Sequence, residues 1–306
     1  MKWMMVFFAS LGLSMPALQG CTTAPIRYSV EKPVLVQQTV PGVGACQGLL
    51  IHDGSVWLYG DAETGVVRRL VFENGRLTDT GETYLLTQRR TVRPYTYGDK
   101  TVELNQNLLS HPTGLTIHPE FGCFIGDTIM QRGRIYHIDW DRLINDGNLD
   151  NAVLNTTYDD LAVNGCRPEF VRWGGRWLIA TSDYGDQANQ LRLYDPEKLA
   201  KAKKTSDPGV LVAQFPCGPF VQSMHWIDHD RTLVLAQNQT AGLGYRLTML
   251  KFGQGAEAPS VERIIDLDYP EDELEGFGIA APGWAVMTSA MRERNVSITP
   301  WPVVAE

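Results

Sequence analysis

The chain contains a pattern of paired strands that occurs five times between residues 47 and 289. In four copies a polar residue precedes an apolar run, and a second run ends 14 residues later on another short polar residue. The copy that begins at Gln222 takes 16 residues, and we expect the hairpin at residues 227–231 to hold the extra two. The copies begin 66, 56, 53 and 53 residues apart, a period typical of β-blades. The paired residues are Gln47 with Asp61, Thr113 with Asp127, Glu169 with Asp183, Gln222 with Asn238, and Glu275 with Ser289.

Sheets of three or four strands cannot cover their own faces, so blades at this spacing stack around an axis. We therefore predict an all-β protein, a five-bladed β-propeller. The last copy has three strands, and the strand-like residues 33–39 precede the first copy. That run is expected to complete the last blade and close the ring, which removes two exposed sheet edges. Residues 88–110 could instead form a sixth blade, and a two-sheet sandwich is a weaker alternative.

Turn residues support the strand assignments within the repeat. Asn74-Gly75 lies between two strand-like runs and is the strongest short hairpin signal in the chain. Asp195-Pro196 is expected to begin a short helix, because Asp caps helices well and Pro suits the first helical position. The residues that end the second strands are expected to bond their own backbone at the strand ends.

The first 20 residues have the pattern of a secretory signal peptide. Lys2 precedes an apolar stretch at residues 3–18, and residues 18–21 read Leu-Gln-Gly-Cys, which resembles a bacterial lipobox. The prediction is a signal peptide at 1–20, lipidation of Cys21, a tether at 21–32 and a single propeller domain at 33–306. Thr22 resembles the residue found in outer-membrane lipoproteins. The predicted location is the bacterial cell envelope, with acyl chains on Cys21 in the outer-membrane bilayer and the domain facing the periplasm. An ordinary cleaved signal is the alternative.

The net charge of −8 argues against nucleic acid as a partner, because phosphate binding needs a concentrated basic face. Apart from Cys21, the chain has four cysteines, an even number that favours disulfides in an oxidising compartment. Cys166 and Cys217 both lie just before an inner strand, so we predict a disulfide between them. The pairing of Cys46 and Cys123 is left open.

Ligands of propellers usually bind where the inner strands begin, around the mouth of the central channel. This end is predicted to carry amides, two carboxylates and one cation, a set suited to hydrogen bonding a polar ligand. The predicted ligand-binding residues are Gln47, His111, Thr113, Arg167, Glu169, Gln222, His225 and Glu275.

The sequence segments 111–115, 124–127 and 134–138 resemble parts of the blades of gluconolactonase, regucalcin and NHL-like propellers. The resemblance implies a lactone or ester hydrolase with calcium in the channel, held by Glu, Asn and Asp side chains. Glu169, Glu275 and Asn164 are the candidate ligands that it implies here. Gln47 stands where that group has an acidic residue.

Two classes of function therefore remain open. The favoured class is a membrane-tethered propeller that binds a polar small molecule, a glycan or a protein partner at the channel mouth. The alternative is a calcium-assisted lactone or ester hydrolase. A further alternative comes from the resemblance in blade count to five-bladed glycosidases, in which Glu169 and Glu275 would be the catalytic carboxylates.

Overall fold

The computed structural model describes residues 24–88, 92–97, 100–105, 109–129, 132–240, 244–268 and 272–303. The predicted signal peptide and Cys21 lie outside these residues. No helix in the described ranges is both long and apolar enough to cross a membrane.

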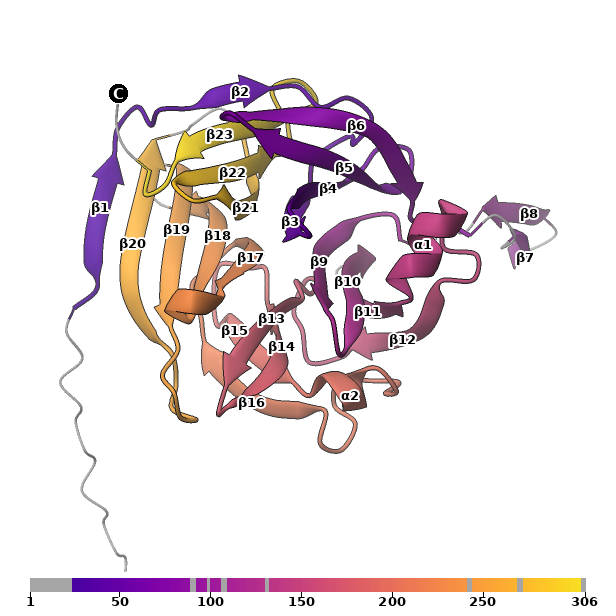
Figure 1. The fold of residues 1–306 in the computed structure, drawn as a ribbon. Helices are drawn as coiled ribbons and strands as arrows, with labels where there is room; N and C mark the ends of the chain where they lie inside the picture. Colours follow the sequence, from indigo (N-terminus) through magenta and orange to yellow (C-terminus); the bar gives the residue numbers. More distant parts are fainter. Residues whose placement is uncertain are drawn as a thin grey trace, which may run out of the picture.

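Five sheets form a ring, and the first strand of each lines the centre (Figure 1). Blade 1 contains β3 (Gly48–His52), β4 (Ser55–Asp61), β5 (Gly65–Glu73) and β6 (Arg76–Leu85). Blade 2 contains β9 (Pro112–His118), β10 (Gly122–Ile129), β11 (Arg132–Ile138) and β12 (Val153–Asp159). Blade 3 contains β13 (Glu169–Trp173), β14 (Arg176–Ser182), β15 (Gln190–Tyr194) and β16 (Leu211–Pro216). Blade 4 contains β17 (Val221–Ile227), β18 (Thr232–Thr240), β19 (Gly244–Lys251) and β20 (Ser260–Asp268). Blade 5 contains β21 (Leu274–Ala281), β22 (Trp284–Ser289) and β23 (Val296–Pro300). The all-β, five-bladed propeller is confirmed.

The N-terminal strand closes the ring as predicted. β2 (Val36–Gln38) pairs antiparallel with β23 and becomes the outer strand of blade 5. Just beyond it, the Asn295 side chain accepts a hydrogen bond from the Val40 N–H (2.8 Å) and donates one to the Val40 carbonyl (2.9 Å). Because these bonds join residues 255 positions apart, they fasten the two ends of the propeller to each other.

A further strand extends blade 4 at its outer edge. β1 (Ile26–Val30) pairs parallel with β20, and Figure 1 shows it along the outside of that blade. The sequence analysis placed these residues in the tether. Their pattern contains one buried residue after four exposed ones, so it carries little strand periodicity of its own.

The described residues between 88 and 110 do not form a sixth blade. β7 (Val92–Tyr97) and β8 (Lys100–Asn105) form a separate two-stranded sheet, which projects outside the ring in Figure 1. The predicted helix is present as α2 (Pro196–Leu199), with the Asp195 side chain accepting from the Lys198 N–H (3.1 Å). A longer helix, α1 (Trp140–Asp146), lies between β11 and β12.

Two turns follow from local chemistry. Asn74 and Gly75 both have positive φ (52° and 73°), which produces the two-residue hairpin between β5 and β6. The β17–β18 hairpin contains the short 3₁₀ helix η1 (Asp228–Asp230), which accounts for the longer spacing in this copy. Both turns occur where the sequence predicts them.

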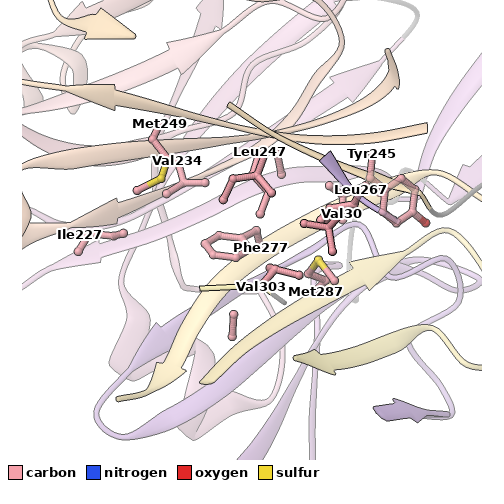
Figure 2. Packing of buried hydrophobic residues seen from close by; sticks show 14 residues of the cluster. Val30, Ile227, Val234, Tyr245, Leu247, Met249, Leu267, Phe277, Met287 and Val303 are labelled. Carbon is pink, nitrogen blue, oxygen red and sulfur yellow. The ribbon is translucent and has the colours of Figure 1, made fainter. Parts of the chain in front are cut away.

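The cores lie between neighbouring blades. In the core between blades 4 and 5, Val234 and Leu247 face Phe277 and Met287, as Figure 2 shows. Each blade therefore buries its faces against the next, which explains why the sheets form a closed ring.

The predicted Cys166–Cys217 disulfide is wrong, because both thiols are free, as are those of Cys46 and Cys123. Cys166 lies in the core between blades 2 and 3, where its Sγ donates to the Arg134 carbonyl (3.1 Å). Cys217 packs against the core between blades 3 and 4. The two residues come before neighbouring inner strands but point into different interblade cores, so the shared register did not bring them together.

Candidate functional site

Three predicted residues form a hydrogen-bonded relay where the inner strands begin. The Arg167 Nε donates to the Gln222 carbonyl (3.1 Å), and its Nη2 donates to Gln222 Oε1 (3.4 Å). Gln222 Nε2 in turn donates to Glu275 Oε1 (3.3 Å). The relay thus connects the loop before blade 3 with the inner strands of blades 4 and 5. Arg167 and Glu275 are only 4% and 3% exposed.

The loop that carries Arg167 packs closely against blade 2. A Cβ atom at Gly126 would lie 2.4 Å from the Cys166 carbonyl oxygen, and one at Gly114 would lie 2.8 Å from the Pro168 backbone nitrogen. Glycine is therefore required at both positions for this close approach. The Thr113 hydroxyl donates to the same Cys166 carbonyl and fixes the loop further.

The relay contains a buried cation without a carboxylate partner. Among the described ion pairs, none joins Arg167 to an acid within 4.0 Å. Its guanidinium contacts the Asn164 carbonyl (3.4 Å) and lies 5.1 Å from the centre of the Tyr184 ring. Burial raises the pKa of Glu275 well above its usual range, and nearby Glu273 adds to this. Burial thus favours the uncharged form of Glu275.

The remaining predicted residues at this end have separate contacts. His111 Nδ1 lies 2.9 Å from Asp61 Oδ2, and the His111 N–H donates to Asp127 Oδ1 (3.0 Å). Burial raises the pKa of Asp127 to about 6. Gln47 is buried immediately before β3.

Asp183, at the end of β14, shows the backbone-bonding role predicted for this position. Its carboxylate accepts from the Gln190 N–H (2.9 Å) and the Val163 N–H (2.8 Å), and it forms a buried ion pair with Arg192 (2.6 Å). These contacts fix strand ends and adjoining loops, so Asp183 is a structural residue.

A cavity lies farther along the channel, toward the end at which the inner strands finish. Its volume is about 150 Å³, and its walls come from the inner strands of blades 1 to 4 and from Trp177 on β14. Two predicted ligand-binding residues, Glu169 and His225, line it. The other lining residues are Leu49, Leu50, Ile51, Thr116, Ile117, His118, Phe170, Trp177, Met224 and Trp226.

Glu169 is positioned by two neighbouring blades. Its Oε1 accepts a hydrogen bond from the Trp226 N–H of blade 4 (2.9 Å). The Thr116 side chain of blade 2 also hydrogen-bonds the carboxyl, and Thr116 Oγ1 accepts from the Phe170 N–H (3.2 Å). Burial raises the pKa of Glu169 to about 8. The carboxyl is therefore mostly protonated at neutral pH and can donate a hydrogen bond.

His225 is also held by a backbone amide. Its Nε2 accepts from the Ile279 N–H of blade 5 (3.2 Å), which places the proton of the neutral ring on Nδ1. Burial lowers the pKa of His225 to about 4. The ring packs edge-to-face on Phe277, with centroids 5.9 Å apart. His225 is therefore uncharged at neutral pH and has one ring N–H left as a donor.

A β-bulge brings residues three positions apart in the sequence to the channel. The pairing of β17 with β18 shifts between Val221 and Ser223, so Gln222 is the extra residue. Strict alternation would place Gln222 and His225 on opposite faces of the strand. The bulge lets Gln222 join the relay while His225 reaches the cavity below it. The sequence has no Gly or Pro at this position to signal the bulge.

The candidate calcium ligands do not gather in one place. Glu169 lies in the cavity, Glu275 is part of the relay, and Asn164 supplies a backbone carbonyl to Arg167. No group of three or more His, Cys, Asp or Glu side chains that could hold a metal ion occurs in the part of the chain that the structure describes. Calcium takes six to eight oxygen ligands, so these residues do not fit it.

The fold and the channel define a five-bladed β-propeller with buried polar groups at its centre. Comparison with protein-family models and with curated proteins gave no match. Two solved structures have a similar fold. A luciferin-regenerating enzyme is 12% identical, with a TM-score of 0.49 over 90% of this chain and 97% of that chain. The PQQ-bound aldose sugar dehydrogenase from Streptomyces coelicolor is also 12% identical, with a TM-score of 0.44 over 88% of this chain and 98% of that chain. At this identity the likeness concerns the fold alone.

Proposed function

We propose that this protein binds a small, uncharged polar molecule in the channel cavity. The observation that carries the proposal is the way Glu169 and His225 are held at the cavity. One polar atom of each side chain accepts a backbone N–H from the next blade, at 2.9 and 3.2 Å. This fixes the orientation of both side chains. The Nδ1–H of His225 and the part of the carboxyl that Trp226 and Thr116 do not bond are then available to a ligand.

The ligand class follows from charge and size. Glu169 and His225 are both uncharged near neutral pH, so the cavity has no fixed ionic group to attract a charged ligand. A hydroxyl or carbonyl group would satisfy both side chains. A volume of about 150 Å³ equals roughly five water molecules at about 30 Å³ each. This accommodates a polyol, or one ring at the end of a glycan, with Phe170 and Trp177 as apolar walls.

The sequence before the propeller supports a membrane tether as part of this proposal. Lipidation of Cys21 would hold the propeller at the outer membrane, where it would meet periplasmic solutes. The Cys21→Ser variant should then move from the membrane fraction to the soluble fraction. Unchanged partitioning would contradict the tether and leave the cavity proposal standing.

One observation favours hydrolysis as a second candidate function. Glu169, with a pKa of about 8, is protonated at neutral pH and could act as a general acid toward a glycosidic or ester oxygen. This role needs no metal, in contrast to the calcium-dependent alternative.

The Glu169→Gln variant separates binding from hydrolysis, because an amide keeps the donor and the shape of a protonated carboxyl but cannot transfer a proton. Neutral monosaccharides and polyols would be screened by thermal shift, and calorimetry would measure the compounds that stabilise the protein. Leu50→Trp, which fills the cavity, serves as the negative control. Binding that survives in Glu169→Gln without product formation by wild type supports a binding protein. Product formation that is lost in Glu169→Gln supports a hydrolase.

A further inference from the structure

A large groove lies between blades 4 and 5, at the ends of the hairpins β17–β18 and β21–β22. Its volume is about 740 Å³, within the range of roughly 300–1,000 Å³ found for small-molecule sites. The groove is separate from the channel cavity, since the two share no lining residue. It is lined by Ile227, His229, Asp230, Met249, Glu262, Arg263, residues 279–283, Trp301 and Pro302.

One wall of the groove is apolar. Ile227 and Met249 belong to the core between blades 4 and 5, and Figure 2 shows them at one end of that cluster. Ile279 and Trp301 pack against the same cluster and are partly exposed. The apolar surface of this core therefore continues into the groove instead of being closed by polar side chains.

Arg263, on β20, brings a positive charge to this apolar wall. Its guanidinium carbon lies 5.5 Å from the centre of the Tyr28 ring on β1. The Arg263 Nε is buried, and it has no hydrogen-bond partner among the residues that the structure describes. A second pocket of about 290 Å³, which includes Tyr28, Val30, Ile265 and Val303, also contains Arg263 and Pro302 in its lining. Arg263 therefore lies at the boundary between the groove and this second pocket.

The acidic residues of the groove do not neutralise Arg263. Asp230 is bound by Lys251 Nζ (2.7 Å) and by the Thr232 hydroxyl (3.1 Å). Glu262 is exposed to solvent and lines the groove as the extra residue of a β-bulge on β20. Within the described part of the chain, no carboxylate forms an ion pair with Arg263.

We infer that this groove binds an amphipathic anion, with its acidic head on Arg263 and its aliphatic body along Ile227, Met249, Ile279 and Trp301. The planar guanidinium suits a carboxylate, because it can donate two parallel hydrogen bonds. The apolar wall supplies the affinity for the body. This site lies in a different part of the molecule from the proposed channel site, so an experiment can disprove either proposal and leave the other standing.

The probe is decanoate, used below the concentration at which it aggregates, with binding measured by calorimetry and by thermal shift. Decanol and decyltrimethylammonium have the same aliphatic body with a neutral or a positive head. Wild type should bind decanoate saturably, and decanol and decyltrimethylammonium at least tenfold more weakly. Equal binding of the three probes, or no saturable binding of decanoate, would overturn the proposal without any variant.

Two variants and a matched control locate the site. Arg263→Gln should raise the Kd for decanoate at least tenfold. Ala281 lines the groove, so Ala281→Trp should fill the groove and abolish binding. Arg27→Gln removes the same charge from an exposed position on the adjacent β1 and should leave the Kd within twofold of wild type. Decanoate binding that is unchanged in both groove variants, or equally weakened by Arg27→Gln, would show that the anion binds elsewhere.

Discussion

The carboxyl of Glu169 in blade 3 accepts a hydrogen bond from the backbone N–H of Trp226 in blade 4, at 2.9 Å. This bond joins the inner strands of two neighbouring blades and holds an ionisable group where burial raises its pKa to about 8. The folded protein therefore binds a proton on Glu169 that the unfolded chain releases near pH 4.3.

Glu169 makes the stability of the protein depend on pH. Between about pH 4.3 and 8 the folded state holds more protons at this residue, so its contribution to the free energy of unfolding falls as pH rises. Glu169→Gln removes this pH dependence. The free energy of unfolding of the variant, relative to that of wild type, should therefore increase by on the order of 2 kcal/mol between pH 5 and 9, a figure that allows for water in the channel. Urea unfolding at pH 5, 7 and 9 measures this. A constant difference between the two proteins would contradict the raised pKa.

His225 is expected to have the opposite dependence. Its folded pKa of about 4 lies below the unfolded value near 6.5, so its contribution to stability is lost as pH falls through this interval. NMR of ¹³C-labelled histidine should show one ring that titrates near pH 4, and His225→Asn should remove that resonance. Titration of His225 near 6.5 would contradict the burial of its ring.

Gln222 is expected to stabilise the relay through both of its neighbours. Gln222→Ala removes the side-chain bonds to Arg167 and Glu275 and should cost about 2 kcal/mol in unfolding free energy. The control is Gln190→Ala, because the Gln190 side-chain amide makes only an exposed contact with the Ala188 carbonyl. This variant should lose less than about 0.5 kcal/mol of unfolding free energy. A double-mutant cycle of Gln222→Ala with Glu275→Ala should give a coupling energy of about 1 kcal/mol. Additive effects would mean that Gln222 and Glu275 do not interact.

Asn295 joins the ends of the propeller. Asn295→Ala breaks both hydrogen bonds to Val40 and leaves that backbone unpaired in a buried position, at an expected cost of about 2–3 kcal/mol. Amide exchange should then speed up first in β2 and β23. Asn155→Ala, in blade 2, is a control that should leave these strands protected. Uniform exchange across all blades would show that closure does not depend on this residue.

The four described cysteines should behave as free thiols. A reducing agent should leave the Tm unchanged, and iodoacetamide should modify the buried thiols only after unfolding, since burial raises the pKa of Cys46 and Cys217 to about 12. The mass gained on alkylation of the unfolded, unreduced protein measures this directly. A Tm that falls by several degrees in the reducing agent would indicate a disulfide.

Much of the fold could be predicted from the sequence because a blade repeats local information. Asn74-Gly75 specifies its own hairpin, and the strand before the first copy had to pair somewhere for the ring to close. β1 could not be predicted, because its residues have little strand periodicity and blade 4 has four strands without it. The cysteine pairing failed for another reason: register gives the height of a residue along a blade but not the core into which it points.

The position of the candidate site residues around the channel could be predicted from the sequence, but their arrangement could not. The residues that begin the inner strands do surround the channel, but the sequence does not show the bulge at Gln222 or the amides that hold Glu169 and His225. Those hydrogen bonds join blades distant in the chain. They separate the predicted set into a relay around Arg167 and a cavity beyond it.

The central claim is that Glu169 and His225 bind an uncharged polar ligand in the channel cavity. The most direct test is the NMR signal of His225 Nδ1–H, followed while the best neutral compound from the thermal-shift screen is added to wild type and to Leu50→Trp. We predict that the His225 signal shifts saturably in wild type and stays constant in Leu50→Trp. A compound that binds wild type and Leu50→Trp equally, without moving the His225 signal, would contradict the claim.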